Sequence, residues 1–313
     1  MIRFSAYSMN YLAGAADAFA EDPKEMTRNS WLVVLSAIFT VLSGISHAQE
    51  RSGQFTEQLI WSDEFNDSAS SSPPNAANWK FETGSSGWGN HELETYCGYD
   101  STQPLCDPAH PNAFIGKDGF LHLVARRGGQ GHYTSARLTS QGLQSFQYGR
   151  IEARIKIPKG QGFWPAFWML GDNIHDVQWP ASGELDIMEN IGKQPGTIHG
   201  SIHGTGFIGD VMGLPYTLPD NRAFGDDFHT FGLIWSPRKI QYYVDTPTNI
   251  YATFTPSSLP HGAVWPFDAG KFFFILNLAV GGDWPGPPDA TSRFPQEMLV
   301  DYVRVYARQE MPN

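Results

Sequence analysis

Residues 183–190 read GELDIMEN, a stretch in which three acidic residues are interleaved with apolar ones. Alternation of this kind predicts a β-strand, because successive side chains of a strand point to opposite faces. Glu184 and Asp186 then share one face, while Leu185 and Ile187 share the other and can enter a core. Like charges held side by side on a strand repel one another, so the acidic face needs an explanation beyond strand formation.

Glu189 breaks this alternation. It stands five residues after Glu184, so a regular strand would turn it towards the apolar face. Burying an unpaired carboxylate there would be very costly. A single β-bulge near Met188 inserts one extra residue and returns Glu189 to the acidic face. We therefore predict that Glu184, Asp186 and Glu189 all face a cleft.

Three carboxyl groups in this order suit the hydrolysis of glycosidic bonds. Retaining glycosidases use two carboxyl groups roughly 5–5.5 Å apart, one as nucleophile and one as acid/base. Glu184 and Glu189 can lean towards each other across Asp186, which can hydrogen-bond the nucleophile and help to keep Glu189 protonated. Crowded carboxylates titrate together with at least one raised pKa, which a general acid requires.

Two other interpretations of the acidic stretch remain open at this point. Three acids could bind Ca²⁺, although a straight strand cannot wrap around an ion and no D-x-D-x-D-G loop is present. They could also form a solvated acidic face, which leaves the regular apolar alternation and the flanking tryptophans unexplained.

Other segments of the chain alternate in the same way, and none has a sustained helical period. These strand-like segments are residues 121–125, 150–158, 239–245, 272–280 and 299–306, with Gly, Pro, Asn and Asp between them. Many short strands without helices predict an all-β sandwich or jelly roll. One face of a curved sheet would then form the cleft.

The N-terminal part of the chain is typical of a targeting segment. Residues 31–46 are mostly apolar, but they are shorter than the about 20 residues that a membrane anchor needs. Arg28 precedes them and a small-residue cleavage pattern follows, so residues 26–48 are predicted to be a secretory signal peptide. Residues 1–25 are interpreted as an extra N-terminal extension, and residues 49–313 as one domain of a secreted protein.

Composition narrows the range of partners. The net charge is −11 and Lys and Arg form no run, so nothing favours binding to nucleic acid or to anionic membranes. The chain has 10 Trp among 14% aromatic residues. That is more than a core needs, and flat aromatic faces can hold the apolar faces of sugar rings.

Cys97 and Cys106 are the two cysteines of the chain. Their closeness in a secreted protein predicts one local disulfide, with two free buried thiols as the alternative. A zinc site is not indicated, because only two thiols are present and no H-E-x-x-H motif occurs.

The acidic stretch resembles the catalytic E-x-D-x-x-E signature of glycoside hydrolase family 16. Further motifs similar to that family are WSDEF at 61–65, WGNHELETY at 88–96, FWPAFWML at 163–170, WP at 179–180, LNLAVGGDWPG at 276–286 and VDYVRVY at 300–306. The resemblance covers about residues 57–308.

The resemblance implies a β-jelly-roll sandwich of two curved antiparallel sheets with a concave cleft, forming a single catalytic domain. It also implies a retaining double displacement in which Glu184 is the nucleophile, Asp186 its helper and Glu189 the acid/base. The bulged spacing looks like that of laminarinases, agarases and carrageenases, whereas lichenases and xyloglucan transglycosylases usually lack the extra residue. One departure is NHELE at residues 90–94, where many laminarinases have NNELQ, and it affects the expected subsite specificity.

Several aromatic and polar residues are candidates for sugar binding. The candidates for stacking on sugar rings are Trp164, Trp168, Trp179 and Trp284, with core packing as the alternative for each. Asn90 and Arg137 look like the family's contacts to sugar hydroxyls, and a structural salt bridge is the alternative for Arg137. His203 is expected to donate a hydrogen bond to substrate or to Glu189. His199 stands four residues before His203, about 13 Å away along a strand, which is too far for a shared metal.

The resemblance also allows a structural Ca²⁺ on the convex side, to which Glu64 and Asp301 would contribute. No cofactor is expected for catalysis. The sequence as a whole predicts a secreted, monomeric, laminarinase-like endo-β-1,3-glucanase that acts on β-glucan and extends to mixed-linkage β-1,3-1,4-glucan. The alternatives are a non-catalytic β-glucan-binding protein on the same fold, a hydrolase of agar or carrageenan, and a transglycosylase.

Overall fold

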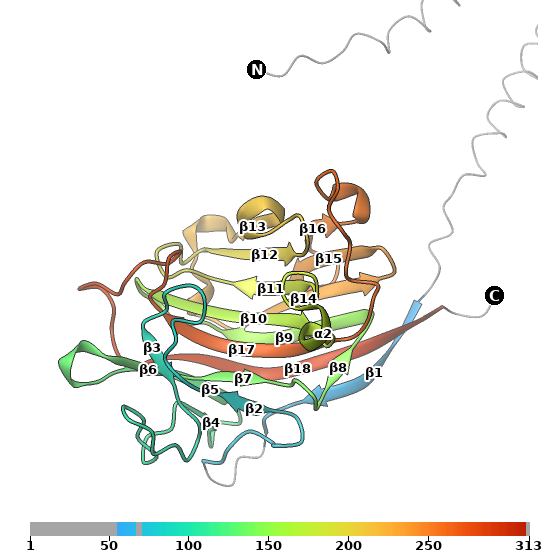
Figure 1. The fold of residues 1–313 in the computed structure, drawn as a ribbon. Coiled ribbons are helices and arrows are strands. Elements are labelled where there is room, and N and C mark those ends of the chain that lie inside the picture. Colours follow the sequence, from blue (N-terminus) through green and yellow to red (C-terminus); the bar gives the residue numbers. More distant parts are fainter. Residues whose placement is uncertain (1–54, 67–70, 311–313) are drawn as a thin grey trace, which may run out of the picture. The chain divides into compact units, whose positions relative to one another are not determined.

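The structure of the protein is a computed structural model that describes residues 55–66 and 71–310. The predicted extension (residues 1–25) and signal peptide (26–48) lie outside these residues. The described residues fold almost entirely into strands, as predicted, arranged in two layered sheets (Figure 1). Within them, no helix has the length and apolar character needed to cross a bilayer.

The strands are β1 (Phe55–Asp63), β2 (Lys80–Glu82), β3 (Glu94–Tyr96), β4 (Ala113–Ile115), β5 (Leu121–Arg127), β6 (Tyr133–Ser135), β7 (Arg137–Thr139), β8 (Ser145–Phe146), β9 (Gly149–Lys156), β10 (Phe163–Gly171), β11 (Glu184–Glu189), β12 (Thr197–His203), β13 (Gly213–Thr217), β14 (His229–Ser236), β15 (Lys239–Val244), β16 (Ile250–Phe254), β17 (Phe272–Val280) and β18 (Gln296–Glu310). The helical turns are α2 (Ile174–Val177) and the 3-10 helices η1 (Gly129–Gly131), η2 (Gly209–Met212), η3 (Pro219–Asn221), η4 (Phe224–Asp226) and η5 (Pro256–Ser258).

One sheet has the order β16-β15-β14-β9-β18-β5-β6-β3, with β1 on β18 and β4 on β5. The other, called the cleft sheet below, has the order β13-β12-β11-β10-β17-β7-β2, with β8 on β17. The pairs are antiparallel except β3 with β6, which is parallel. In the cleft sheet β10 to β13 are consecutive hairpin neighbours, whereas β17, between β10 and β7, comes from a distant part of the chain, as in the crossing connectivity of a jelly roll.

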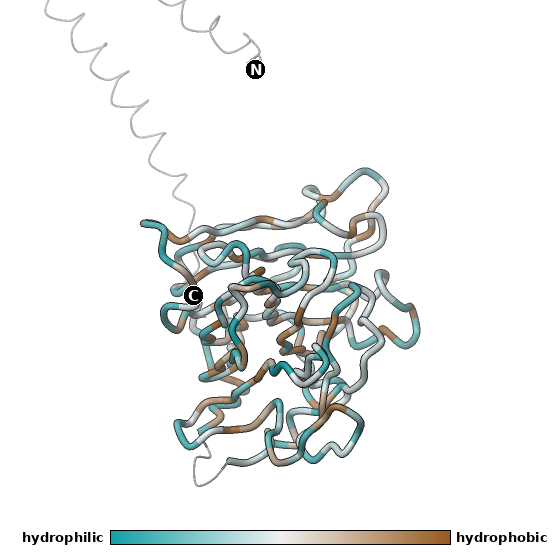
Figure 2. The backbone as a smooth tube through the Cα atoms, turned by 90° about the vertical axis from the view of Figure 1, so that its left-hand side faces the viewer, coloured by the Kyte–Doolittle hydropathy of each residue, from teal (hydrophilic) through white to brown (hydrophobic). Residues whose placement is uncertain are grey.

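The core lies between the two sheets, where the apolar side chains of alternating strand positions meet. Figure 2 views the layers from the side, and its brown, apolar segments lie mainly towards the middle. Burying these side chains is the main favourable contribution to folding. The alternating segments predicted from the sequence correspond to β5, β9, β15, β17 and β18.

β17 departs from a simple alternation because all nine of its residues are buried. One face enters the core. On the other face, Phe273 and Ile275 pack with Leu170 in a second cluster, against Trp168 and Ile174 of the short helix α2. Both faces of β17 are therefore covered, and its central position lets it carry polar groups into the cleft.

Candidate active site

The bulge that the sequence predicts is present in β11. In the pairing with β10, Met188 lies opposite Phe167 and Asp186 lies opposite Trp168, so one residue of β11 is extra. The pairing with β12 shifts over the same residues. Ile187 and Met188 both enter the core. Two consecutive core residues return Glu189 to the same face as Asp186, and the prediction of a bulge is confirmed.

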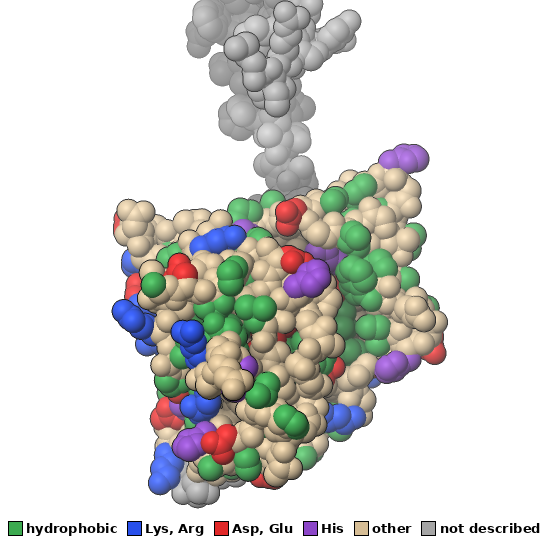
Figure 3. All heavy atoms as spheres, turned by 60° about the vertical axis from the view of Figure 1, so that its left-hand side comes forward, with side chains coloured by type: hydrophobic (Ala, Val, Ile, Leu, Met, Phe, Trp, Pro, Cys, Tyr) green, Lys and Arg blue, Asp and Glu red, His purple; other side chains and the backbone are tan. Residues whose placement is uncertain are grey.

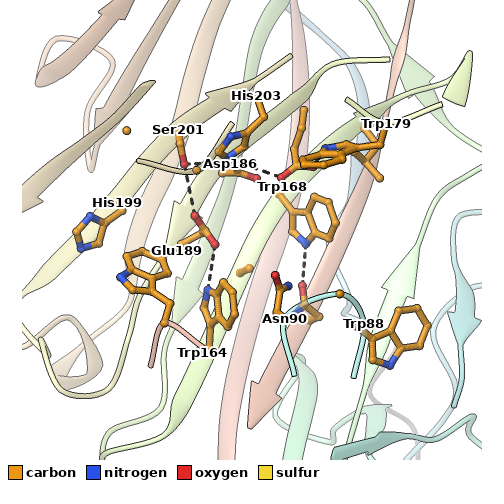
Figure 4. Close-up of a pocket in the computed structure, with 18 of the residues that line it drawn as sticks. Trp88, Asn90, Trp164, Trp168, Trp179, Asp186, Glu189, His199, Ser201 and His203 are labelled. Carbon is orange, nitrogen blue, oxygen red and sulfur yellow. Dashed lines mark hydrogen bonds and ion pairs between the residues drawn. The ribbon is translucent and has the colours of Figure 1, made fainter. Parts of the chain in front are cut away.

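The three acids line a cleft of about 520 Å³ that runs across the cleft sheet. Its other lining residues come from β7, β10, β12, β17 and neighbouring loops, and include Trp88, Asn90, Glu92, Arg137, Trp164, Trp168, Trp179, His199, Ser201, His203, Asn277 and Trp284. Figure 3 shows a hollow in this face, with histidine and hydrophobic side chains along it. Ten of the cleft residues are labelled in the close-up of Figure 4.

Each outer glutamate receives a hydrogen bond from a tryptophan. Nε1 of Trp179 donates to Oε2 of Glu184 over 2.8 Å, and Nε1 of Trp164 donates to Oε1 of Glu189 over 3.0 Å (Figure 4). Trp164 lies on β10, beside the acidic strand, whereas Trp179 is half exposed in the loop before it. Each end of the acidic row therefore receives one indole N–H, and the donor to Glu184 is more exposed to solvent than the donor to Glu189.

Asp186 is the buried centre of the row. The hydroxyl of Ser201 donates to its Oδ2 over 3.1 Å and to Oε2 of Glu189 over 3.4 Å. Nε2 of His203 lies 2.9 Å from the same Oδ2 and 3.9 Å from Oε1 of Glu184. Asp186 also acts on Glu184, whose pKa it raises. It thus connects both glutamates to the neighbouring strand.

Burial sets the electrostatics of these acids. It raises the pKa of Glu184 to about 8 and that of Glu189 to about 8, and in both the charge of Asp186 adds to the effect. Burial likewise raises the pKa of Asp186 to about 7. The charge of His203 lowers the pKa of both glutamates, as does the indole N–H beside each. The row can thus hold a proton near neutral pH, which general acid catalysis requires.

The position of His203 corrects part of the sequence interpretation. The expected alternative in which His203 hydrogen-bonds Glu189 is wrong, because β11 and β12 run antiparallel and place His203 opposite Glu184. His199 is the histidine opposite Glu189. His203 lies near the other end of the acidic row, with its Nε2 beside Asp186 and Glu184, although its charge lowers the pKa of both glutamates.

The tryptophans form the walls of the cleft. Trp164 and Trp168 lie on the cleft face of β10, whose pairing with β17 has no irregularity, so their shared parity is retained. Trp284, in the loop after β17, packs edge to face on Trp164 with ring centroids 5.6 Å apart and on His199 at 4.9 Å. All four predicted tryptophans line the cleft.

Arg137 and Asn90 lie at the end of the cleft formed by β7 and the loop before β3. The guanidinium of Arg137 pairs with Glu82 and stacks between the rings of Trp88 and Trp168, at 4.7 and 4.8 Å. Arg137 therefore lines the cleft and also forms the structural ion pair. Nδ2 of Asn90 donates to Oε1 of Glu92 over 3.1 Å.

The cleft residues that the sequence interpretation did not single out include Ser201 and Asn277. Ser201 stands midway between His199 and His203, and strand parity alone would have placed it on their face. Asn277 is the single polar residue of the apolar run at residues 272–280. A polar residue in a buried strand must find partners, and that signal pointed to it.

The residues predicted for calcium are engaged elsewhere. Glu64 forms a two-point ion pair with Arg304, over 3.0 and 2.8 Å. Oδ2 of Asp301 accepts from Nη1 of Arg154 over 2.7 Å. As placed, the two carboxylates offer oxygens to different arginines. Among the described residues, the set of donors close enough to share a metal is Glu184, Asp186 and His203 in the cleft.

Cys97 and Cys106 are joined by a disulfide. Cys97 directly follows β3 and is buried. The bond closes the loop that leads away from the Asn90 end of the cleft.

Known proteins resemble this chain across the same region. The model described as Glycosyl hydrolases family 16 matches residues 109–303, which include the whole acidic strand. A β-glucanase of Rhodothermus marinus is 38% identical over 264 residues, covering 80% of this chain and 85% of that protein. Glucan endo-1,3-β-glucosidase A1 of Niallia circulans is 36% identical over 279 residues, covering 80% of this chain and 38% of that protein. The catalytic domain of an endo-1,3-β-glucanase (laminarinase) of Thermotoga petrophila is 41% identical, with a TM-score of 0.72 over 82% of this chain and 100% of that chain.

Proposed function

Since the chain belongs to the glycosyl hydrolases of family 16, we infer that it is a retaining endo-β-1,3-glucanase of the laminarinase type. The observation that carries this inference is the bulged strand β11, which turns Glu184 and Glu189 into one cleft walled by tryptophans. Relatives that match most of this chain are a glucan endo-1,3-β-glucosidase and an endo-1,3-β-glucanase (laminarinase).

In the proposed mechanism Glu184 is the nucleophile and Glu189 the acid/base. Glu189 gives its proton to the glycosidic oxygen while Glu184 attacks the anomeric carbon, which forms a glycosyl-enzyme and releases one product. Glu189 then removes a proton from water, and that water displaces Glu184. Two inversions retain the anomeric configuration. The charge of His203 and the indole N–H of Trp179 support the ionised form of Glu184, against the effects of burial and of the Asp186 charge.

The cleft suits a neutral sugar chain. Indole faces bury the apolar C–H faces of sugars without requiring charge. The cation of Arg137 is neutralised by Glu82, so the cleft offers little to the sulfate groups of carrageenan. We propose laminarin-type β-1,3-glucan as the substrate, with mixed-linkage β-1,3-1,4-glucan as a second one.

The alternative of a glucan-binding protein without activity is disfavoured by the presence of both glutamates, each with its own hydrogen-bond donor. Incubation with laminarin, lichenan, agarose and carrageenan, followed by sizing of the products, tests the proposal. Internal cleavage of laminarin is expected from the start of the reaction. Binding of laminarin without cleavage would favour the alternative, and cleavage of agarose alone would overturn the substrate assignment.

We propose that the protein is secreted. The Cys97–Cys106 disulfide supports this, because disulfides persist in oxidising compartments. The apolar residues 31–46 support it as well. The monomeric state and the structural Ca²⁺ stay predictions, and no step of the mechanism involves a metal.

A further inference from the structure

Two glutamates that the mechanism does not use lie at the Asn90 end of the cleft. Glu92 is 8% exposed and Glu94 is 1% exposed. They belong to one short segment that continues into β3. Ionised carboxylates are expensive to bury side by side, so two of them here need a compensating arrangement.

The hydrogen bonds distinguish the two carboxyl groups. Both oxygens of Glu92 accept, from Nδ2 of Asn90 over 3.1 Å and from the hydroxyl of Tyr96 over 2.9 Å. Oε2 of Glu94 accepts from the backbone N–H of Val280 over 2.7 Å. Oε1 of Glu94 is buried and meets no donor among the described residues. The Glu92 carboxyl is the side chain whose charge and polar interaction act most on Glu94.

We propose that Glu94 is a positioning residue: it is held as a neutral carboxylic acid whose Oε1–H donates to the Glu92 carboxylate and thereby fixes the sugar-binding groups at this end of the cleft. The proposal rests on the proposed function, because it deepens the account of how the same cleft binds its substrate. One proton then gives Glu92 a third donor and gives Oε1 of Glu94 its missing partner.

Two series of hydrogen bonds connect Glu92 to side chains that line the cleft. In the first series, Nδ2 of Asn90 donates to Glu92. This hydrogen bond fixes the orientation of the Asn90 amide, and its Oδ1 remains available to a sugar hydroxyl. In the second, Tyr96 has a single proton and gives it to Glu92, so its oxygen accepts from Nδ2 of Asn277 over 3.2 Å. Oδ1 of Asn277 is then left to accept from Nε1 of Trp168 over 2.7 Å. Asn90 and Trp168 both line the cleft (Figure 4).

The surroundings of Glu94 favour its neutral form. Burial raises its pKa well above the usual range, and the charge of Glu92 raises it further, against a smaller opposing effect of the Val280 N–H. The other titratable groups around it are Tyr96 on its own strand and Tyr133, its pairing partner on β6. Arg137 of β7 acts on Tyr96 but is engaged by Glu82.

The protonation state is tested by thermal unfolding between pH 5 and 9, comparing the wild type with Glu94→Gln. Gln keeps the shape, accepts from Val280 and donates to Glu92 at every pH. A group whose pKa is raised by folding loses its stabilising effect as pH rises. The Tm of Glu94→Gln is therefore expected to exceed that of the wild type progressively towards pH 9. Glu64→Gln is the control for the direction of the effect, because folding lowers the pKa of Glu64 rather than raising it. The Tm of this variant should be lower than that of the wild type above about pH 5.

The positioning role is tested by the affinity for a laminari-oligosaccharide at pH 6, measured by calorimetry in the inactive Glu184→Gln background. Adding Glu94→Gln should leave the Kd within about threefold, whereas adding Glu94→Leu should weaken it about tenfold or more, because Glu92 then lacks a donor. Equal Kd values for the Gln and Leu variants, both folded, would overturn the positioning role.

A Tm difference between the wild type and Glu94→Gln that does not change with pH would overturn the neutral acid. If the Glu184→Gln protein binds no glucan while the Tm difference grows with pH, the proposed substrate fails and the protonation of Glu94 stands. The two failures are therefore distinguishable.

Discussion

Nε2 of His203 lies 2.9 Å from Oδ2 of Asp186, an ion pair across two neighbouring strands of the cleft. The charge of this histidine lowers the pKa of Glu184 and of Glu189. It therefore opposes the burial that raises both, and it is a means by which the protein sets the pH range of the reaction.

Replacing His203 with Gln should move both limbs of the pH profile of kcat/KM to higher pH by about one unit, because an opposite charge nearby has been removed. Gln can still hydrogen-bond Asp186, which limits structural damage. His199→Gln is the matched control, since His199 lies on the same strand but is not among the main influences on the pKa of either glutamate. A profile that stays in place for His203→Gln would contradict this account.

Removing the indole N–H of Trp179 and that of Trp164 should have different effects on the acidic and basic limbs of the pH profile of kcat/KM. Trp179→Phe removes the N–H that favours the ionised form of Glu184, the proposed nucleophile, so the acidic limb of the pH profile should rise by about half a unit. Trp164→Phe removes the corresponding donor from Glu189, so the basic limb should rise instead. Loss of stacking can raise KM in both variants without moving the limbs. The assignment of roles would be reversed if the two limbs exchanged their responses.

Substrates with a good leaving group distinguish the two glutamates. Glu184→Gln and Glu189→Gln should each lose about 10³-fold or more of their activity on laminarin. On an aryl β-glucoside with an acidic phenol, the first step needs no proton from residue 189. Glu189→Gln should therefore show a burst of released phenol, and Glu184→Gln should not. A burst of phenol from Glu184→Gln would contradict the assignment of Glu184 as the nucleophile.

The raised pKa values also predict a cost in stability. Folding raises the pKa of Glu184, Asp186 and Glu189, so their contribution to the free energy of unfolding declines as pH rises from about 4.5 through 7 to 8. The double variant Glu184→Gln/Glu189→Gln should be more stable than the wild type at pH 8 and nearly equal to it at pH 5. Urea unfolding at both pH values measures this, and an equal difference at both would argue against buried titration.

The disulfide should stabilise the Asn90 end of the cleft. Replacing Cys97 and Cys106 together with Ser should lower the free energy of unfolding by about 2–3 kcal/mol, as expected for a short closed loop. Reducing agent should shift the wild type towards the double variant and leave the variant unchanged. If reductant destabilised both equally, the effect would not come from this bond.

Much of the acidic strand was determined by the sequence itself. Alternation is a local property, so the faces of Glu184, Asp186 and Leu185 follow from the two-residue period of a strand. The bulge follows as well, because the alternative was a buried and unpaired Glu189. The strands at residues 121–125, 150–158 and 272–280 were predictable for the same reason.

Only the tertiary structure decided which groups meet across strands. His203 lies opposite Glu184 because of the register between β11 and β12, and a hairpin's register depends on the loop that joins its strands. Arg137 finds Glu82 on β2, and Tyr96 of β3 finds Asn277 of β17, over separations that no local pattern encodes. Burial, which raises the pKa of Glu94 and of the three acids of β11, likewise comes from the packing of the two sheets. The sequence alone therefore specified the acids and the face they share, whereas long-range pairing decided which of them hold protons and which partners orient them.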